Sequence, residues 1–553
     1  MPGKIRINFN GKNIESPEGI TLQELVSQHM MDSEQPPVVA AKVDNRMREL
    51  TYALKQDCTV ESIDLSMKDG ERIYTRSLVF LFLRACRELF PDCYVTVEHS
   101  FGGGLYCEVH GCVALSPLVT ERIEEHMRAI VNMDEPFEKK DVPMEEANKI
   151  FLQQGLKDKV EVMKYRKEDT MNLYQCGDVI DYLYGYMVPS TGYLKKFGLK
   201  FYLPGVILQY PSCEDPIRVR PFQDNPKLFT VFRLAEKWSA AMGIRNVADL
   251  NRCIEEGRAS DLIRISEAYQ EKQIGAIADR ITQHADAVRM ILIAGPSSSG
   301  KTTFAQRLRV QLMVNGLHPV PISMDNYYLD RDQVSVDDNG EQDLESIEAI
   351  DLKLFNEQMT QLIQGQEVEI PHYNFLTGKR EWVGHVIKLS KDQPIIVEGI
   401  HGLNEKLTEM IPAENKYKIY ISALTQLNVD DHNRIPTTDA RLIRRMVRDY
   451  QFRGTPIEDT LAMWPIVRRG EEKNIFPFQE SADIMFNSAL LYELAVLKPY
   501  ILPLLENITE SHLYFSEVNR LNKFLKYFLD LDSRDIPNNS ILREFIGGST
   551  FEK

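Results

Sequence analysis

The chain has 553 residues, a formal net charge of −16, 43% hydrophobic residues and 26% charged residues, so we expect several soluble domains rather than one core. The acidic balance argues against a protein that coats nucleic acid in general. No apolar run approaches the roughly 20 residues of a membrane span, and the N-terminus has no signal-peptide core, which predicts a cytoplasmic protein with no membrane contact.

Residues 1–70 alternate short strand-like runs with one helical pattern. The runs are Lys4–Phe9, Val38–Lys42 and Ser62–Leu65, and the helix begins near Thr21, with Glu24 where a capping box places its acid. This order predicts a small β-grasp domain. The eight cysteines of the chain show no paired C-x-x-C spacing, so we interpret them as reduced thiols.

The stretch VVAAKVDNRMRELTYAL resembles the TGS domain found at the N-terminus of threonyl-tRNA synthetases. The resemblance continues into the second, editing domain of those enzymes through FLRACRELFPD and LYQCGDVIDYLYGYMVPSTGYLKKF. It implies an α+β domain of this type over residues 71–211.

The metal-ligand motifs of that editing domain are absent from this sequence. Its H-x-x-x-H pair falls on Arg76 and Phe80, and its C-x-x-x-H pair falls on Leu183 and Met187, none of which serves as a zinc ligand. Editing activity therefore looks lost, and we expect an inactive regulatory or assembly role. Contact with RNA or tRNA, binding of a small effector and plain dimerisation stay open for this half, and we expect a homo-oligomer.

Residues 212–285 combine a proline-rich linker with helical stretches, and they lead into the most informative part of the sequence. Met290–Ala294 is a continuous apolar run that predicts a buried parallel strand. The loop that follows fits G-x-x-x-x-G-K-[ST], which predicts an ATP site. Its predicted nucleotide-binding residues are Gly295, Pro296, Ser297, Ser298, Ser299, Gly300, Lys301, Thr302 and Thr303.

Each chemical group of this loop has a physical role in holding phosphate. The two glycines let the backbone wrap around a phosphate, and the helix N-terminus adds partial positive charge. We expect Lys301 to contact the β- and γ-phosphates and the Thr302 hydroxyl to bind Mg²⁺.

Two carboxylates follow later apolar runs. Asp325 comes after PVPISM and is suited to accept the proton of an attacking hydroxyl, while Glu398 ends QPIIVE and is placed to bind Mg²⁺. Because open parallel sheets hold ligands at the carboxyl ends of their strands, we expect both near the phosphate loop.

The block TTDARLIRRMVRDYQFRGTPIEDT predicts two helices. Thr437 or Thr438 could cap the first, Gly454 could end it, and Thr455 with Glu458 resembles a capping box for the second. Arg441, Arg445 and Arg448 recur at spacings of four and three on one helix face, which favours a phosphate clamp.

Residues 289–488 resemble the uridine kinase and phosphoribulokinase family. The family pattern S-x-D-x-[FY]-Y is met at Ser323, Asp325, Tyr327 and Tyr328; P-x-Y-x-F is met at Pro371, Tyr373 and Phe375; and R-R-x-x-R-D followed by R-G is met from Arg444 to Gly454. The resemblance implies a lid over ATP that includes Arg453. It also implies an acceptor site whose residues are Tyr328, Glu345, Tyr373, Arg380 and Arg445.

The base-reading residues of pyrimidine nucleoside kinases are replaced, with Gly378 where they carry a histidine and Met463 near their glutamine. Loss of such polar contacts weakens selection for one base. The nucleoside identity therefore stays open.

We predict an α/β multidomain protein with a parallel-sheet kinase domain over residues 286–489, the connector over 212–285, and C-terminal core helices over 490–553. The predicted function is ATP- and Mg²⁺-dependent transfer of the γ-phosphate to a nucleoside 5'-hydroxyl, with Lys301, Asp325, Arg445 and Arg448 as catalytic residues. The alternatives are an ATP-switched RNA-binding regulator and a sugar-phosphate kinase.

Overall fold

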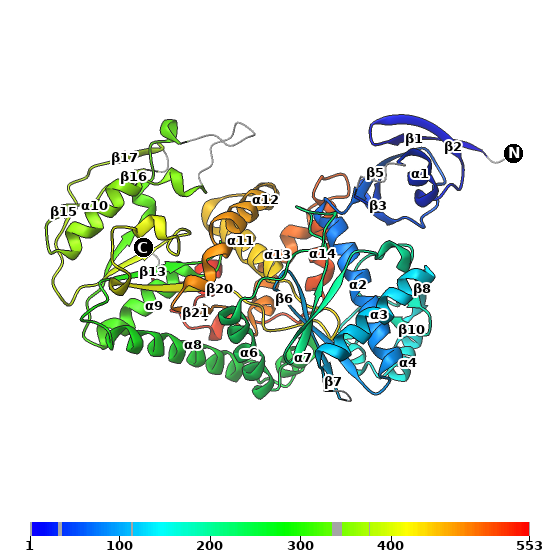
Figure 1. Cartoon of the computed structure of the whole chain (residues 1–553), viewed down its shortest axis with the longest axis horizontal. Helices are drawn as coiled ribbons and strands as arrows, with labels where there is room; N and C mark the ends of the chain where they lie inside the picture. The colour runs from blue at the N-terminus through cyan, green and yellow to red at the C-terminus, as the bar shows by residue number, and fades with distance from the viewer. Residues whose placement is uncertain (1–2, 31–35, 112–113, 335–344, 375–376, 552–553) are drawn as a thin grey trace.

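The computed structural model describes the chain except for residues 1–2, 31–35, 112–113, 335–344, 375–376 and 552–553. Figure 1 shows an elongated molecule with the N-terminal strands at one end and a parallel sheet at the other. Among the described helices, none combines the length and the apolar character that a bilayer crossing requires.

The N-terminal domain is a five-stranded mixed sheet in the order β2-β1-β5-β3-β4. Helix α1 (Leu22–His29) covers it, and Thr21 and Glu24 form the predicted capping box at its start. The parallel pairing of β1 with β5 inside a sheet of antiparallel neighbours confirms the β-grasp prediction. The strands are β1 (Lys4–Phe9), β2 (Lys12–Pro17), β3 (Val38–Val43), β4 (Arg46–Glu49) and β5 (Cys58–Asp64).

The second region is built on α2 (Lys68–Leu89), which is buried along most of its length because apolar side chains occupy nearly every face. Two antiparallel sheets flank it, in the orders β10-β9-β8 and β11-β12-β7-β6. The strands are β6 (Tyr94–Phe101), β7 (Gly104–His110), β8 (Glu138–Pro143), β9 (Thr170–Cys176), β10 (Val179–Asp181), β11 (Gly198–Tyr202) and β12 (Gly205–Gln209). The helices are α3 (Pro117–Met133), α4 (Met144–Gln153) and α5 (Lys157–Met163).

The cysteines only partly follow the prediction of reduced thiols. Six of them, Cys58, Cys86, Cys107, Cys176, Cys213 and Cys253, are free. Cys93 is disulfide-bonded, so the prediction is wrong at this residue. C-x-x-C spacing is a local signal, and it carries no information on cysteines that folding brings together.

Three connector helices lead to the parallel sheet: α6 (Pro226–Ala241), α7 (Val247–Glu255) and the long α8 (Ala259–Thr282). Helix α8 packs along α9 (Lys301–Val314), the helix that follows the phosphate loop. Glu271 on α8 pairs with the buried Arg307 on α9 at 2.7 Å. The connector therefore fixes the helix on which the loop ends.

The sheet at the other end of the molecule is parallel throughout, in the order β14-β19-β13-β20-β21. Its central strand β13 (Met290–Ala294) is buried at every residue, as the apolar run predicts. The other strands are β14 (Val320–Ser323), β19 (Ile395–Glu398), β20 (Lys416–Ser422) and β21 (Ile484–Asn487). Short antiparallel pairs lie outside it, formed by β15 (Val368–Glu369) with β18 (Val386–Ile387) and by β16 (His372–Asn374) with β17 (Lys379–Glu381).

Helices α10 (Leu352–Ile363), α11 (Thr437–Arg453), α12 (Ile457–Asn474) and α13 (Glu493–Glu506) belong to the same region. Gly454 ends α11 with φ 63°, as predicted. The predicted threonine caps are wrong, because α11 begins after Pro436 and α12 after Pro456, with no side-chain cap bond at either. Proline fixes its own φ near the helical value, so each helix starts after a proline and has no side-chain cap.

The C-terminal segment does not stay at one end of the molecule. Its helix α14 (Phe515–Leu525) lies beside α2, where Glu517 pairs with Arg72 at 2.6 Å (Figure 1). The short α15 (Arg543–Ile546) returns to the parallel sheet, where Glu544 accepts a hydrogen bond from Thr303 at 2.8 Å. This segment therefore connects the N-terminal half with the phosphate loop.

A buried ion pair joins the second region to the parallel-sheet region. The Lys159 ammonium lies 2.9 Å from Asp430 and 3.2 Å from Asp181, and all three side chains are almost fully buried. Burial acts to lower the pKa of Lys159, but Asp181 and Asp430 outweigh it and raise that pKa. His432 closes the group by contacting Asp181 at 2.6 Å.

We expect Lys159→Met to lower the free energy of unfolding by about 3–5 kcal/mol, because it leaves buried carboxylates without their cation. Lys164→Met is the matched control, since Lys164 pairs with Glu161 on the solvent side near the end of the same helix. Its loss should stay within about 0.5 kcal/mol. Urea unfolding checks both, and equal midpoints for the two variants would show that the buried pair contributes nothing.

Candidate functional site

The phosphate loop connects the end of β13 to the start of α9. Gly300 stands at the helix N-cap with φ 82°, a conformation that glycine adopts without strain. Gly295 is equally constrained, because a Cβ there would lie 2.0 Å from the Ile421 carbonyl oxygen. The two glycines of the motif are therefore required by the backbone path itself.

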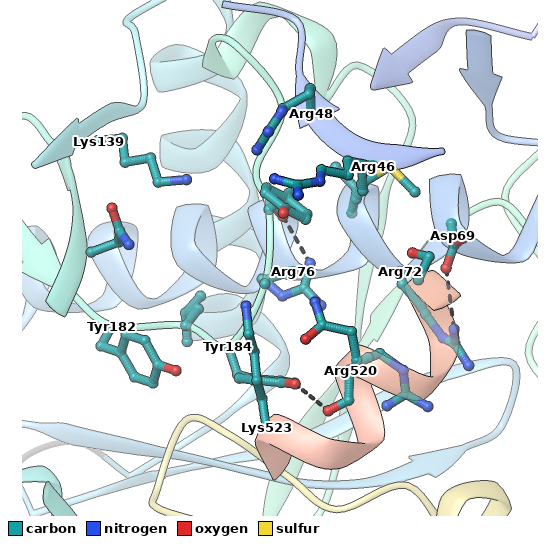
Figure 2. A pocket seen from close by; sticks show the side chains of 18 of the residues that line it. Arg46, Arg48, Asp69, Arg72, Arg76, Lys139, Tyr182, Tyr184, Arg520 and Lys523 are labelled. Atoms are coloured by element: carbon teal, nitrogen blue, oxygen red, sulfur yellow. Dashed lines mark hydrogen bonds and ion pairs between the residues drawn. The ribbon is translucent and has the colours of Figure 1, made fainter. Parts of the chain in front are cut away.

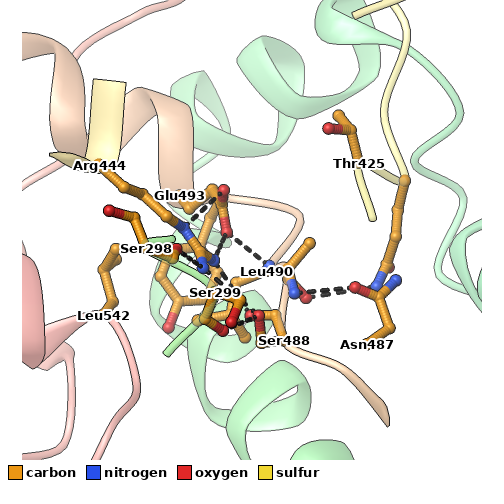
Figure 3. Close-up of polar contacts among 12 residues, drawn as sticks. Ser298, Ser299, Thr425, Arg444, Asn487, Ser488, Leu490, Glu493 and Leu542 are labelled. Atoms are coloured by element: carbon orange, nitrogen blue, oxygen red, sulfur yellow. Dashed lines mark hydrogen bonds and ion pairs between the residues drawn. The ribbon is translucent and has the colours of Figure 1, made fainter. Parts of the chain in front are cut away.

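Two buried arginines of α11 hold this loop from behind. Arg441 pairs with Glu471 and donates to the Ser297 carbonyl at 3.2 Å. Arg444 pairs with Glu493 and lies beside Ser298 and Ser299, as Figure 3 shows. Because both guanidiniums are occupied in this way, their role is to position the loop.

A residue that directly follows β21 also holds the serines of the loop. Ser488 donates from its hydroxyl to the Ser299 carbonyl at 2.6 Å (Figure 3). The Ser297 amide donates to Glu471 at 2.8 Å, so the carboxylate that pairs with Arg441 also orients the loop. The loop is thus preorganised by groups outside its own sequence.

Arg445, Arg448 and Arg453 form a second, more open group of cations around Asp449. Arg445 lies 3.3 Å from Asp449 and donates to the Ser297 hydroxyl at 2.8 Å, while Arg448 and Arg453 contact the same carboxylate at 2.8 and 3.4 Å. Burial lowers the pKa of Arg445, and Asp449 opposes this. Three guanidiniums share one carboxylate, so positive charge is in excess beside the loop.

The carboxyl ends of β13, β19 and β14 bring three titratable groups together. In the parallel register Ser323, which ends β14, stands beside Glu398, which ends β19, and Asp325 follows in the next turn. The Thr302 hydroxyl donates to Glu398 at 3.0 Å, and Lys301 donates to the Gly295 carbonyl at 2.8 Å. The sequence prediction that these groups share one edge of the sheet agrees with this geometry.

Asp325, Glu398 and Lys301 shift one another's pKa values. Burial raises the pKa of Asp325, and Lys301 limits the rise. Burial likewise raises the pKa of Glu398, again against the charge of Lys301. Burial lowers the pKa of Lys301, with Glu398 and Glu544 acting in the opposite direction.

Three of the predicted acceptor residues, Tyr328, Glu345 and Tyr373, lie near one another, and Tyr328 lies near Asp325. The rings of Tyr328 and Tyr373 lie 5.5 Å apart. Burial raises the pKa of Tyr328, followed by the charges of Asp325 and Glu345. Glu345 also packs on Gly470 of α12, where an added Cβ would lie 3.0 Å away. These side chains therefore belong to one neighbourhood.

Arg380 is held differently from the other acceptor residues. It stands opposite Tyr373 in the β16–β17 hairpin, and its guanidinium pairs with Asp351 at 2.9 Å. Phe375, the last residue of the P-x-Y-x-F match, lies outside the described residues.

Two contacts of the loop have no counterpart in the sequence analysis. Ile541 packs on Gly300, and Glu544 receives bonds from the backbone amide and the hydroxyl of Thr303. Thr303 and Glu544 are 241 positions apart in the chain, and no local sequence pattern links them.

The four positions that the resemblance aligns with zinc ligands carry Arg76, Phe80, Leu183 and Met187. Phe80, Leu183 and Met187 are buried in one apolar cluster, and Leu183 also lines a cavity together with Arg76. Within the part of the chain that the structure describes, the one group of three candidate metal ligands is Glu98, His99 and Glu236, which includes none of these four positions.

Comparison with known proteins agrees with both halves of this description. Residues 290–493 match the profile of the Phosphoribulokinase / Uridine kinase family. The N-terminal region is similar to threonine–tRNA ligases: the match is 30% identical over 191 residues for that of Symbiobacterium thermophilum and 35% identical over 164 residues for that of Fusobacterium nucleatum. These matches cover 34% and 29% of this chain, but only 29% and 26% of the ligases.

Among solved structures, a possible uridine kinase from Bacillus stearothermophilus is 18% identical, with a TM-score of 0.27 over 39% of this chain and 98% of that chain. Residues 290–493, with their phosphate loop, thus match the phosphoribulokinase and uridine kinase family, and they follow an N-terminal region that is similar to part of the threonine–tRNA ligases.

Proposed function

We propose that the protein transfers the γ-phosphoryl group of ATP to the 5'-hydroxyl of a nucleoside, with a pyrimidine nucleoside as the first candidate. The observation that carries this proposal is the meeting of Lys301, Asp325 and the Thr302–Glu398 pair at the carboxyl edge of neighbouring parallel strands. A carboxylate, a cation and a hard-oxygen pair at one edge are what phosphoryl transfer requires.

The phosphates of ATP occupy the loop over Gly295–Thr303 in this proposal. Lys301 and the loop amides neutralise the β- and γ-phosphates, and Arg445, Arg448 and Arg453 neutralise charge on the transferring group from the other side. Their shared partner Asp449 balances only one of the three guanidiniums. Stabilisation here comes from positioned charge, which needs no reorganisation during the reaction.

Asp325 is the proposed base for the acceptor hydroxyl. Burial raises the pKa of its carboxyl, which makes the carboxylate a better proton acceptor than an exposed aspartate. The charge of Lys301 acts against this rise. We assign Tyr328, Glu345, Tyr373 and Arg380 to the acceptor pocket on the same side as Asp325.

The Thr302 hydroxyl and the Glu398 carboxylate fit a Mg²⁺ site, because both offer hard oxygen atoms and lie within 3.0 Å of each other. Bound Mg²⁺ supplies positive charge between the β- and γ-phosphates. Thr302 belongs to the loop and donates to this carboxylate, so the loop and the proposed metal site share one side chain.

We further propose that the chain divides at residues 70, 211, 285 and 489, and that the N-terminal 211 residues have a regulatory or assembly role in a homo-oligomer. What supports this is the lack of zinc ligands at Arg76, Phe80, Leu183 and Met187.

The kinase proposal predicts nucleoside-dependent ADP release. With Mg²⁺ and ATP, one nucleoside from a panel of nucleosides and sugar phosphates should stimulate release by the full chain. Lys301→Ala should lower this stimulated rate by about 10²–10³-fold, since it removes the cation of the loop. If only a sugar phosphate stimulates release, the acceptor is a sugar phosphate and not a nucleoside. ATP binding without any stimulation would contradict the kinase proposal.

A second prediction isolates the base. Asp325→Asn should lower kcat by about 10²–10⁴-fold while leaving ATP affinity nearly unchanged, because the amide keeps the shape but accepts no proton. Asp332→Asn is the control, since Asp332 is an exposed carboxylate a few residues further along the chain. Steady-state kinetics and ATP titration check both variants, and an unchanged kcat for Asp325→Asn would remove this residue from the role of base.

A further inference from the structure

A second cavity, of about 580 Å³, includes no residue of the phosphate loop. It lies where β4, α2, the loop after β10 and α14 meet, so its walls come from both ends of the sequence. Figure 2 shows the side chains of Arg48, Arg76, Lys139 and Lys523 directed toward the same space above Tyr182. Segments that are distant in sequence thus build one pocket.

Positive charge dominates this lining. Nine arginines and lysines line the cavity, against Asp69, Glu168 and Glu510. Glu49 and Glu517 reach some of these cations from outside the lining. The lining cations without a carboxylate partner in the described part of the chain are Arg48, Arg76, Lys523 and Lys526. In a chain of net charge −16, such a local excess marks an anion site.

Arg76 is the central group of this excess. Its guanidinium donates to the Tyr186 carbonyl at 2.8 Å, and it approaches the backbone so closely that a Cβ on Gly185 would lie 2.4 Å away. Burial lowers the pKa of Arg76 to about 10, because the cation is desolvated without an acid beside it.

Lys523 on α14 faces Arg76 across the cavity (Figure 2). Partial burial and the charges of Arg166 and Lys139 lower its pKa, while Glu168 acts in the opposite direction. Repulsion between Lys523 and the neighbouring cations disfavours the charged state of Lys523, and a bound anion relieves this repulsion. The wall therefore favours a ligand with more than one negative charge.

Size and ring chemistry restrict that ligand. A volume of about 580 Å³ lies within the range of small-molecule sites. Tyr186 is half-buried at the cavity wall, with the Lys139 ammonium 5.2 Å from its ring centroid. Tyr182 and Tyr184 line the same space, so a planar group can pack beside the anion site.

We propose that this cavity binds a small phosphorylated molecule of nucleotide size, with its phosphate groups between Arg48, Arg76 and Lys523 and its planar part against the tyrosines. The ligand is a polyanion, because four unpaired cations face one space. This site is distinct from the proposed kinase site and does not depend on it.

The test uses the full chain carrying Lys301→Ala, which weakens phosphate binding at the loop. Isothermal titration calorimetry measures binding of nucleoside mono- and triphosphates and of inorganic tripolyphosphate. At least one nucleotide should bind with a Kd below about 1 mM, the range of a few charge-assisted contacts. Adding Arg76→Met should weaken that binding about tenfold, the loss of one such contact.

Two further variants keep the result interpretable. Lys523→Met removes an exposed cation at the rim, so the fold should survive, and it should weaken binding about fivefold. Arg264→Met is the control, because Arg264 is exposed on α8 and outside the cavity, and it should change nothing. The proposal is overturned if no small phosphate binds, if both cavity variants bind normally, or if only a tRNA binds in an Arg76-dependent way.

Discussion

The burial of two guanidiniums against the phosphate loop is the constraint on which the rest of the kinase region depends. Arg441 and Arg444 are among the largest fully buried side chains, and each needs a carboxylate beside it. Removing one partner of such a pair costs about 3–5 kcal/mol, since the other charge stays buried. Glu471 therefore ties α12 to the loop, and Glu493 ties α13 to it.

Helix α11 carries both the support of the loop and its open cations because of its periodicity. Residues three and four apart share a face, so Arg441, Arg444, Arg445 and Arg448 all reach the loop side. Depth decides what each one does: the first two are sealed behind the loop, and the last two lie nearer to solvent with Asp449. One helix can thus hold a site rigid and still present free charge to it.

The same helix connects the phosphate loop to the cationic cavity. Asp439, in the first turn of α11, receives a two-pronged ion pair from Arg520, which lines that cavity. Arg520 also pairs with Glu517, the partner of Arg72 on α2. A series of ion pairs therefore runs from the N-terminal half to the helix behind the loop. In this series each charged side chain is neutralised by the next one.

Features with signals inside a few residues could be predicted from the sequence. The strand Met290–Ala294, the capping box at Thr21 and the carboxylates Asp325 and Glu398 belong to this group, because an apolar run or a motif marks each of them. The threonine caps predicted for α11 and α12 are wrong, because a proline occupies the N-cap position of each helix. The contacts of Ile541 and Glu544 with the loop could not be predicted, since only the tertiary fold brings them together.

The cavity around Arg76 illustrates why a shared fold does not fix the chemistry of a site. The four positions aligned with zinc ligands carry none, and three of them, Phe80, Leu183 and Met187, belong to the apolar core. Arg76 instead brings a charge into the space and requires Gly185 to leave room for it. Nine cations of the protein line this cavity against three carboxylates, so an anion is the ligand that fits its charge.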